Sequence, residues 1–401
     1  MRVELNDVCE LIVDCEHKTA PTQETGYPSI RTPNIGRGFF ILEGVNRVSD
    51  ETYRLWSRRA VPRAGDLIMA REAPVGNVAM VPPGLEPCLG QRTLLIRPDP
   101  AKVAPAFLNY FLNGPYVQSL IHAKTNGATV PHLNMKDVRT LVLPCLPPLP
   151  IQRRIAGILS AYDELIENSQ RRIRILEAMA RALYREWFVH FRFPGHDSLP
   201  RVLSPLGEIP EGWEVKKLGE IAEDVRRNVS KGELEEVTPY VGLEHIPRRS
   251  LALDAWETVA QLGSNKLEFK KGDVLFGKIR PYFHKVSIAP FDGLCSADTI
   301  VIRARRPEHY AIVIACVSSD AFVAKASATA NGAKMPRANW QVLEEFPVAI
   351  PKGDIAETFN SLFTGIIDEQ QALVFQTQTL RRTRDLLLPR LLSGQIAVQA
   401  A

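Results

Sequence analysis

The sequence has no apolar run long enough to cross a bilayer, since the longest, around residues 311–317, is far shorter than a membrane-spanning helix. Residues 1–7 lack the apolar stretch of a signal peptide. Its six cysteines are scattered, without a C-x-x-C pair or paired histidines nearby. These absences argue against a disulfide framework and a structural zinc site, and they predict a cytoplasmic protein.

Catalytic and nucleotide-binding motifs are also missing. The chain contains no G-x-x-x-x-G-K-[ST], no G-x-G-x-x-G after a strand, no H-E-x-x-H and no G-x-S-x-G. Residues 113–116, N-G-P-Y, differ by one residue from the N-P-P-Y loop of amino-methyltransferases and are interpreted as a turn. Residues 214–216, E-V-K, imitate the E-x-K of metal-dependent nucleases and are interpreted as a charged strand start. We therefore expect no catalysis, and no cofactor or metal bound by this chain.

Chain length and net charge limit only the number of domains and the class of binding partner. A chain of 401 residues exceeds what one hydrophobic core usually serves, so two or more domains are expected. Lys and Arg number 49 against 45 Asp and Glu, a formal net charge of +4. Such a mild excess is compatible with nucleic-acid binding if the basic residues cluster on one surface.

Two long helices are predicted, at residues 151–188 and 355–392, the first preceded by Pro150. Apolar residues recur in each at alternating steps of four and three, the period of a helix with one buried seam. The predicted seam residues are Ile155, Ile158, Tyr162, Leu176, Leu183, Phe359, Leu362, Ile366, Leu380 and Leu387. We expect the helices to pair as an antiparallel coiled coil. The alternative is that each packs on its own domain. Polar residues at Ser169, Gln370 and Arg384 interrupt the seam and are expected to set register or contact another subunit.

Each of these helices follows one copy of a repeated unit. Residues 65–69 match 272–276, Cys88 matches Cys295 and residues 126–132 match 331–337, all at a spacing of about 205 residues. In the first copy we expect short strands at 67–69, 78–81 and 93–96 and one helix at about 104–123. The Pro/Gly-rich residues 193–213 are interpreted as a linker.

These features predict an α+β fold with two mixed α/β domains, each followed by a long helix. The predicted divisions are 1–146 for the first domain, 147–190 for the central helix, 191–352 for the linker and second domain, and 353–401 for the distal helix and tail.

Loops that mix cationic, aromatic and small residues occur at matched places in the two copies. Phosphates are bound by Lys, Arg and backbone N–H groups, and base edges by bidentate groups such as Arg and Asn. The candidate DNA-binding residues are Arg71, Asn77, Lys124, Asn126, His132 and Asn134 in the first copy, and Lys278, Arg280, Tyr282, His284, Lys285, Lys334, Arg337 and Asn339 in the second. Residues 32–34 and 244–245 are further candidates. Any one of these charges alone is more simply a solvated surface residue. Their coincidence across the copies favours binding.

The combination of motifs resembles the specificity (S) subunit of Type I DNA restriction-modification systems. Five segments carry the resemblance, which covers essentially the whole chain: residues 149–156, 176–188, 207–213, 272–282 and 384–394. One departure is that the first copy begins almost at Met1, without the G-x-I-P-x-G-W lead-in of the second.

The resemblance implies two target-recognition domains that each bind half of a split double-stranded DNA sequence, with the helices as spacer. It also implies docking of two modification (M) subunits, which bind S-adenosylmethionine and methylate adenine, and of restriction (R) subunits that use ATP and Mg. The chain itself would select sequence without catalysing a reaction. Two other hypotheses remain open: a fused restriction-modification enzyme, and a repeat scaffold that binds proteins only.

Overall fold

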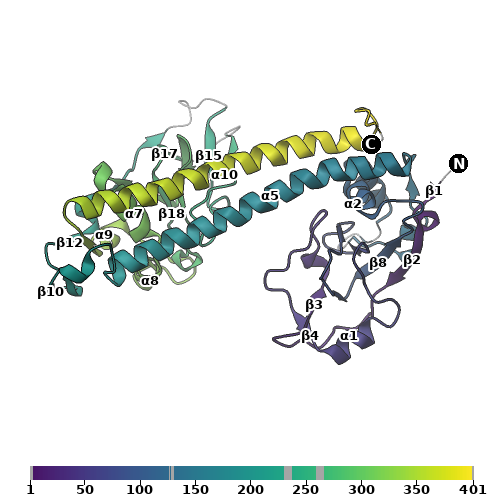
Figure 1. Ribbon diagram of the computed structural model, residues 1–401, viewed down its shortest axis with the longest axis horizontal. Coiled ribbons are helices and arrows are strands. Elements are labelled where there is room, and N and C mark those ends of the chain that lie inside the picture. Colours follow the sequence, from purple (N-terminus) through teal and green to yellow (C-terminus); the bar gives the residue numbers. More distant parts are fainter. Residues whose placement is uncertain (1–2, 126, 128–130, 230–236, 259–265, 400–401) are drawn as a thin grey trace. The chain divides into compact units, whose positions relative to one another are not determined.

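The computed structural model describes residues 3–125, 127, 131–229, 237–258 and 266–399 (Figure 1). The chain divides into two compact units. Unit 1 comprises Met1–Glu164 and Arg381–Ala401, and unit 2 comprises Leu165–Leu380. Both units mix helices and strands, as predicted.

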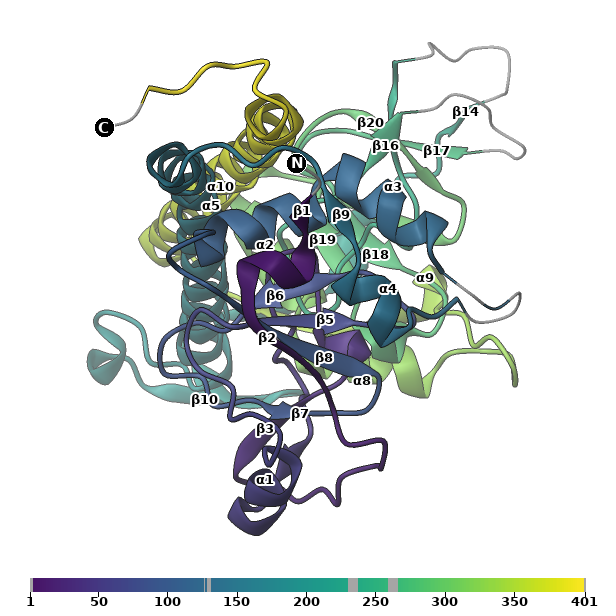
Figure 2. The ribbon, with the colours of Figure 1, turned by 90° about the vertical axis from the view of Figure 1, so that its right-hand side faces the viewer.

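The central element of unit 1 is a four-stranded antiparallel sheet in the order β2–β8–β5–β6 (Figure 2). A three-stranded sheet has the order β4–β3–β7, and β1 pairs with β9. The strands of unit 1 are β1 Val3–Glu4, β2 Cys9–Asp14, β3 Tyr27–Ile30, β4 Arg47–Val48, β5 Leu67–Ala70, β6 Val78–Met80, β7 Cys88–Leu89, β8 Thr93–Pro98 and β9 Val142–Leu143. Its helices are α1 Asp50–Trp56, α2 Pro105–Asn113, α3 Pro115–Ala123 and α4 Met135–Arg139, with 3₁₀ turns at Leu5–Val8 and Thr32–Asn34. The three strands predicted at 67–69, 78–81 and 93–96 are confirmed.

Unit 2 repeats this arrangement around a four-stranded sheet, β13–β21–β18–β19, and a five-stranded sheet, β14–β17–β20–β15–β16. Its strands are β10 Arg201–Ser204, β11 Gly207–Pro210, β12 Glu214–Lys217, β13 Ala222–Asp224, β14 Asn228–Val229, β15 Pro239–Val241, β16 Glu257–Thr258, β17 Lys266–Phe269, β18 Val274–Gly277, β19 Val286–Ile288, β20 Gly293–Ser296, β21 Thr299–Ala304 and β22 Pro347–Ile350. Its helices are α6 Leu218–Ile221, α7 Tyr310–Val317, α8 Asp320–Ala328 and α9 Trp340–Leu343, with 3₁₀ turns at His196–Ser198, Pro281–Phe283 and Pro307–His309.

Both faces of each central sheet are buried, because alternate residues of a strand point to opposite faces. In β5, Leu67 and Met69 join the cluster that contains Phe107 of α2, whereas Ile68 and Ala70 join the cluster on the other face. Strand β18 divides in the same way between two clusters of unit 2. The run of consecutive apolar residues in these strands follows from this double burial.

A buried ion pair recurs at the start of the central strand in both units. Asp66 accepts two hydrogen bonds from the Arg97 guanidinium, at 2.8 and 2.7 Å, and a third from the Arg63 backbone N–H at 2.9 Å. Asp273 accepts two from Arg303, both at 2.7 Å, and one from the Lys270 N–H at 2.7 Å. The internal repeat therefore extends to individual hydrogen bonds.

Removing either aspartate leaves a guanidinium without its partner, but the two arginines differ in exposure. The Arg97 side chain is 13% exposed and that of Arg303 38%. We expect Asp66→Ala to lower the free energy of unfolding by roughly 3 to 5 kcal/mol, the cost of breaking a buried pair. Asp273→Ala should cost less because water can solvate Arg303. Urea denaturation of the full chain measures both. Glu223→Ala, which breaks an exposed pair with Arg305, is the control and should cost about 1 kcal/mol or less. Equal costs for Asp66→Ala and Glu223→Ala would contradict the expectation.

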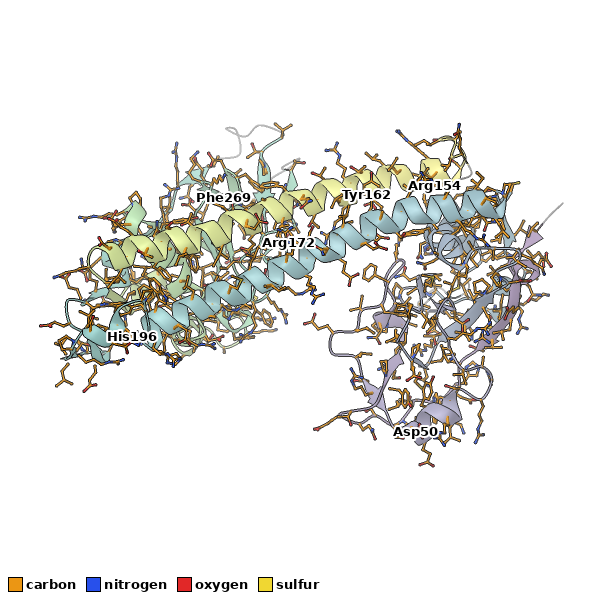
Figure 3. The ribbon with its side chains drawn as sticks, viewed as in Figure 1. Asp50, Arg154, Tyr162, Arg172, His196 and Phe269 are labelled. Atoms are coloured by element: carbon orange, nitrogen blue, oxygen red, sulfur yellow. The ribbon has the colours of Figure 1, made fainter. Side chains whose placement is uncertain are left out.

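The long helices are α5, Leu149–Tyr184, which continues into a π-helical turn at Arg185–Val189, and α10, Asp354–Leu392. Figure 1 shows them side by side in opposite directions, as predicted. In unit 2, Arg172 of α5 (Figure 3) forms an ion pair with Glu369 of α10. In unit 1, Asp163 of α5 pairs with Arg384 of α10 at 2.6 Å. The helices also pack on the globular parts of the units. Packing of each helix on its own domain, predicted as the alternative to pairing, therefore occurs together with the pairing.

The predicted seam residues differ in burial. Ile155 and Phe359 are buried. Leu362 is 50% exposed, and its neighbour Phe363 is buried in its place. The remaining predicted seam residues are partly buried: Ile158, Tyr162, Leu176, Leu183, Ile366, Leu380 and Leu387. Two apolar residues are adjacent at 362–363, and the apolar pattern alone does not decide which one faces inward.

Polar residues interrupt the seam and bond across it or within their own helix. Glu177 of α5 is 5% exposed, and its Oε1 accepts hydrogen bonds from Gln370 Nε2 of α10 at 2.9 Å and from the Leu251 N–H at 2.8 Å. It also accepts hydrogen bonds from the Ser250 hydroxyl and the Ala252 N–H. The Ser169 hydroxyl, by contrast, donates to a carbonyl of its own helix. Gln370 thus bonds across the pair of helices, and its predicted role in setting their register stays a prediction.

Two further predictions need correction. The helix predicted at 104–123 is two helices, α2 and α3, because Gly114 is extended before Pro115, which disfavours helical backbone in the preceding residue. The segment 193–213 is not a linker. It forms the β10–β11 hairpin, and Phe193, Ile209 and Trp213 are buried in the core of unit 2. Burial of its apolar side chains holds this segment in the core despite its Pro and Gly content.

No single described helix is both long and apolar enough to cross a membrane. The bent pair Pro307–Val317 and Asp320–Ala328 meets the length and composition criteria only when its two helices are joined, and residues 311–317 are buried in the core of unit 2.

Candidate nucleic-acid interface

The two loops predicted to bind DNA lie side by side in each unit. In unit 2 the Ala338 N–H donates to the Lys278 carbonyl at 2.9 Å and the Arg280 N–H donates to the Pro336 carbonyl at 2.8 Å. In unit 1 the Leu133 N–H donates to the Arg71 carbonyl at 3.0 Å. In unit 1 the loop 71–77 is joined to the loop 124–134, and in unit 2 the loop 278–285 is joined to the loop 331–339. The joining backbone hydrogen bond lies at matched positions in the two units. Each pair forms one surface.

A third loop, which follows β3 or β15, is tied to this surface by a predicted site residue. Asn77, just before β6, donates through Nδ2 to the Ile35 carbonyl at 3.0 Å. Lys285, just before β19, donates through Nζ to the Leu243 carbonyl. Burial lowers the pKa of Lys285, and the nearby Arg248 guanidinium lowers it further. Asn77 and Lys285 thus occupy matched places, and both hold loops in position.

Unit 1 presents few of its predicted residues freely. Arg71 donates to Asp14 Oδ2 at 2.6 Å and to the Leu133 carbonyl at 2.8 Å, and its side chain is only 16% exposed. Lys124 and His132 are partly buried, and Asn134 is exposed before α4, with its amide 3.3 Å from Asp137. Asn126 lies outside the described residues.

Unit 2 presents a more open set of predicted residues. Tyr282 is 56% exposed, and Lys334 is exposed with no polar partner among the described residues. Lys278 and Arg280 are partly buried. Two other candidates have internal partners: Arg337 lies 3.4 Å from Asp298, and Asn339 caps α9 by accepting the Gln341 N–H.

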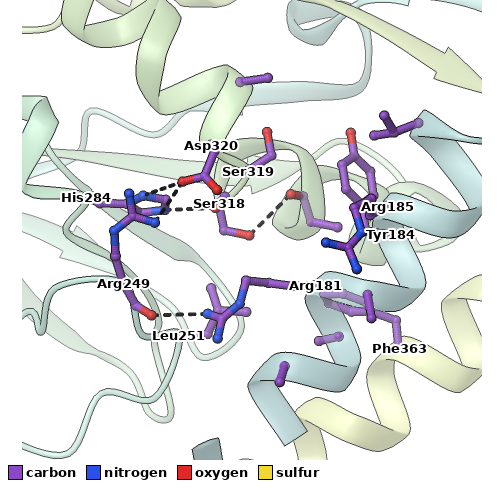
Figure 4. Close-up of a pocket in the computed structure, with 16 residues that line it drawn as sticks. Arg181, Tyr184, Arg185, Arg249, Leu251, His284, Ser318, Ser319, Asp320 and Phe363 are labelled. Carbon is purple, nitrogen blue, oxygen red and sulfur yellow. Dashed lines mark hydrogen bonds and ion pairs between the residues drawn. The ribbon is translucent and has the colours of Figure 1, made fainter. Parts of the chain in front are cut away.

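His284, another predicted DNA contact, lies inside the protein at 7% exposure (Figure 4). It lines a cavity of about 620 Å³ with Arg181, Arg249 and Asp320. Its Nε2 lies 2.9 Å from the Ser318 carbonyl and its Nδ1 3.6 Å from Asp320. Burial lowers the pKa of His284, which favours the neutral ring and hence a hydrogen bond donated through Nε2.

The same cavity contains a chain of contacts from α5 to the β18–β19 loop. Arg181 of α5 donates to the Arg249 carbonyl at 3.2 Å, and the Arg249 N–H donates to the His284 carbonyl at 2.8 Å. The Arg249 guanidinium pairs with Asp320 at 2.9 Å. The helix thereby holds the end of the loop in position.

Sequence reasoning missed one residue of this surface, Arg248. Its guanidinium lies 4.0 Å from the ring centre of Phe283, and its backbone bridges to Lys285. The Arg-Arg pair at 248–249, close to the candidates 244–245, is the signal that could have identified it. In the corresponding region of unit 1, Asn34 is partly buried and donates to the Ile41 carbonyl.

Two thiols and one group of potential metal ligands complete the description of the polar groups in the two units. The matched thiols Cys88 and Cys295 are buried, which raises the pKa of each to about 12 and disfavours the reactive thiolate. Among the described residues one group, Glu244, His245 and Glu257, has potential metal-ligand atoms within 4.8 Å of one another. Two of these residues are exposed, and His245 Nδ1 already accepts the Gly242 N–H. Cations, amides and aromatic rings on joined loops are the chemistry of a polyanion-binding surface.

Comparison with known proteins identifies the class. The sequence model of the Type I restriction modification DNA specificity domain matches residues 1–178 and again 210–373, so the chain belongs to this family. The two matches correspond to the two copies of the repeat. Specificity subunits are non-catalytic components of their complexes, in agreement with the missing catalytic motifs.

Individual relatives have the same description. The chain is 26% identical over 380 residues to the Type I restriction enzyme MjaIX specificity subunit of Methanocaldococcus jannaschii, which covers 90% of this chain and 84% of that one. It is 27% identical over 282 residues to the EcoDI specificity subunit of Escherichia coli, covering 65% and 62%. The crystal structure of a Type I S subunit from M. genitalium shares the fold, with a TM-score of 0.64, 14% identity and coverage of 98% and 95%.

Proposed function

We propose that this chain selects the DNA sequence modified by a Type I restriction-modification complex. Each unit binds one half of a two-part target, and the paired helices separate the halves and dock the M subunits. One observation carries the proposal. The two loop surfaces share the same joining hydrogen bond, yet at the joined position one unit has an internally paired Arg71 and the other Lys278. A shared frame with different side chains suits two surfaces that recognise different sequences.

In this proposal the chemistry belongs to the partners. S-adenosylmethionine binds to the M subunits and ATP with Mg to the R subunits, and this chain holds no cofactor of its own. Its net charge of +4 is small, so we expect moderate affinity for duplex DNA alone. The partners add further phosphate contacts.

The test is to co-express the chain with the methyltransferase encoded beside it and to map adenine methylation across the host genome. A two-part motif with a fixed gap, lost when this chain is omitted, is the expected result. No new methylation from soluble, associated proteins would contradict the proposal. Methylation without a partner would instead support a fused enzyme. A gel shift with labelled target DNA, with unrelated duplex DNA as the competitor, tests the scaffold alternative. Absence of a specific shift would support a scaffold that binds proteins only.

Substitutions on the unit 2 surface should affect one half-site only. Lys278→Ala combined with Lys334→Ala removes two positive charges from the joined loops of this unit. We expect relaxed or weakened recognition in one half of the methylation motif, with the other half unchanged. Arg306→Ala is the control, because Arg306 pairs with Glu308 outside these loops. Equal loss in both halves would indicate misfolding or a surface shared by the two half-sites.

A further inference from the structure

The ring of Phe283 lies against two arginines, Arg280, which was predicted to bind DNA, and Arg248, which was not. The Phe283 ring centre lies 4.0 Å from the Arg248 guanidinium carbon and 6.0 Å from that of Arg280. The loop after β15 supplies Arg248, and the loop between β18 and β19 supplies the other two residues. Contact with an aromatic face leaves the in-plane N–H groups of a guanidinium available for other partners.

Within the described residues the two arginines of this cluster have no salt-bridge partner, and the one carboxylate that acts on it is Glu244, which raises the pKa of Lys285. In the part of the chain that the structure describes, neither Arg248 nor Arg280 forms an ion pair, and the buried Arg280 Nε has no hydrogen-bond partner. Lys285 is close enough for Arg248 to lower its pKa, an effect second to that of burial. Other arginines of the unit, such as Arg249 and Arg303, pair with aspartate. Arg248 is exposed and its guanidinium has no ion-pair partner among the described residues, so it is the group of this cluster that can donate to a ligand.

The backbone under the cluster is held in an uncommon conformation. Arg280 and His284 flank the Pro281–Phe283 turn with φ of 50° and 52°, in the left-handed region that residues other than glycine rarely adopt. Hydrogen bonds from the Arg280 N–H to Pro336 and from the His284 ring to Ser318 fix the two ends. Such conformations persist where surrounding structure determines them and are concentrated at binding sites.

We propose that Arg248, held against Phe283, reads one guanine in the half-site bound by unit 2. Arginine donates two parallel hydrogen bonds to guanine O6 and N7 in the major groove, and a guanidinium fixed by an aromatic ring is oriented before it binds. A phosphate contact needs only a charge, which the exposed Lys334 already supplies. This inference rests on the proposed function and assigns a base-reading residue to it.

The methylation map of the full complex tests the proposal. For Arg248→Ala we expect one guanine position in one half-site to become degenerate, with discrimination lost by about ten- to a hundred-fold. Phe283→Leu should weaken the same position and Phe283→Tyr should preserve it, since only the tyrosine keeps a ring face. Arg306→Ala, an equal change of charge elsewhere in unit 2, should leave the motif unchanged.

A binding measurement then isolates the base contact. Duplex DNA with 7-deazaguanine at the affected position lacks the N7 acceptor. The wild-type complex should bind this duplex about ten-fold more weakly than the normal duplex, while the Arg248→Ala complex should bind the two equally. An unchanged motif in Arg248→Ala, or a uniform loss of methylation at all targets as for a phosphate contact, would overturn the inference alone. A wild-type complex without any two-part motif would overturn the proposed function, and this inference with it.

Discussion

Replacement of Glu177 by alanine is expected to destabilise unit 2 by roughly 1 to 3 kcal/mol for each buried donor that loses its acceptor. The carboxylate accepts hydrogen bonds from Gln370 of α10 and from the backbone and hydroxyl of residues 250–252. Without the carboxylate, these buried donors have no acceptor in the folded chain. In the unfolded chain they form hydrogen bonds with water, so their loss destabilises the fold. Urea denaturation of the full chain, followed by fluorescence of the buried Trp187 and Trp213, measures the loss.

Two matched variants make this test specific. Glu177→Gln keeps the shape and one acceptor oxygen, so it should cost markedly less than alanine. Glu167→Ala, at an exposed position of the same helix, should change stability by about 0.5 kcal/mol or less. A loss in Glu177→Ala no larger than that in Glu167→Ala would show that the network contributes no net stability.

Lengthening both helices by seven residues is expected to widen the gap between half-sites by about three base pairs, at 1.5 Å per helical residue and 3.4 Å per base pair. The insertions belong after Glu164 in α5 and after Leu380 in α10, where the two units divide. Seven residues preserve the seam, because the buried positions repeat at about that interval. Methylation mapping should show both half-sites unchanged and only the gap altered.

Inserting seven residues into α5 alone is the control, since it shifts the seam of one helix against the other. Pairs such as Asp163 with Arg384 and Glu177 with Gln370 cannot then form together, so this variant should lose stability or methylation rather than gain a new gap. Altered half-site bases in the double insertion would contradict the spacer role of the helices.

The fold could be predicted well from sequence because its signals are long or repeated. The helix predictions at 151–188 and 355–392 agree closely with α5 and α10, since a periodic pattern over some forty residues leaves little ambiguity. The errors are local. The apolar pattern does not distinguish Leu362 from Phe363 because the two residues are adjacent. The Pro and Gly content of residues 193–213 predicts a linker, although Phe193, Ile209 and Trp213 are buried and the segment contains the β10–β11 hairpin.

The candidate surface could be predicted only at the level of loops. The loops at 278–285 and 331–339 do lie together, but sequence does not show which polar side chains are used internally. Arg71 and His284 have internal partners supplied by residues distant in the chain, Asp14 and Ser318. Arg248 was missed for the converse reason, since its significance depends on a ring 35 residues further along. Whether each candidate contacts DNA stays a prediction.

The division of α10 between the units has a consequence for how the protein is made. Leu391 is buried in the core of unit 1, whose other members lie between Leu5 and Leu159. During synthesis this core stays incomplete until the ribosome has translated all of unit 2, so the first half to emerge is among the last to be finished. The C-terminal segment acts as the closing element of the N-terminal unit. A nascent chain stalled before residue 391 should therefore expose the apolar core residues of unit 1 that pack with Leu391, which makes them the expected binding site for chaperones and proteases.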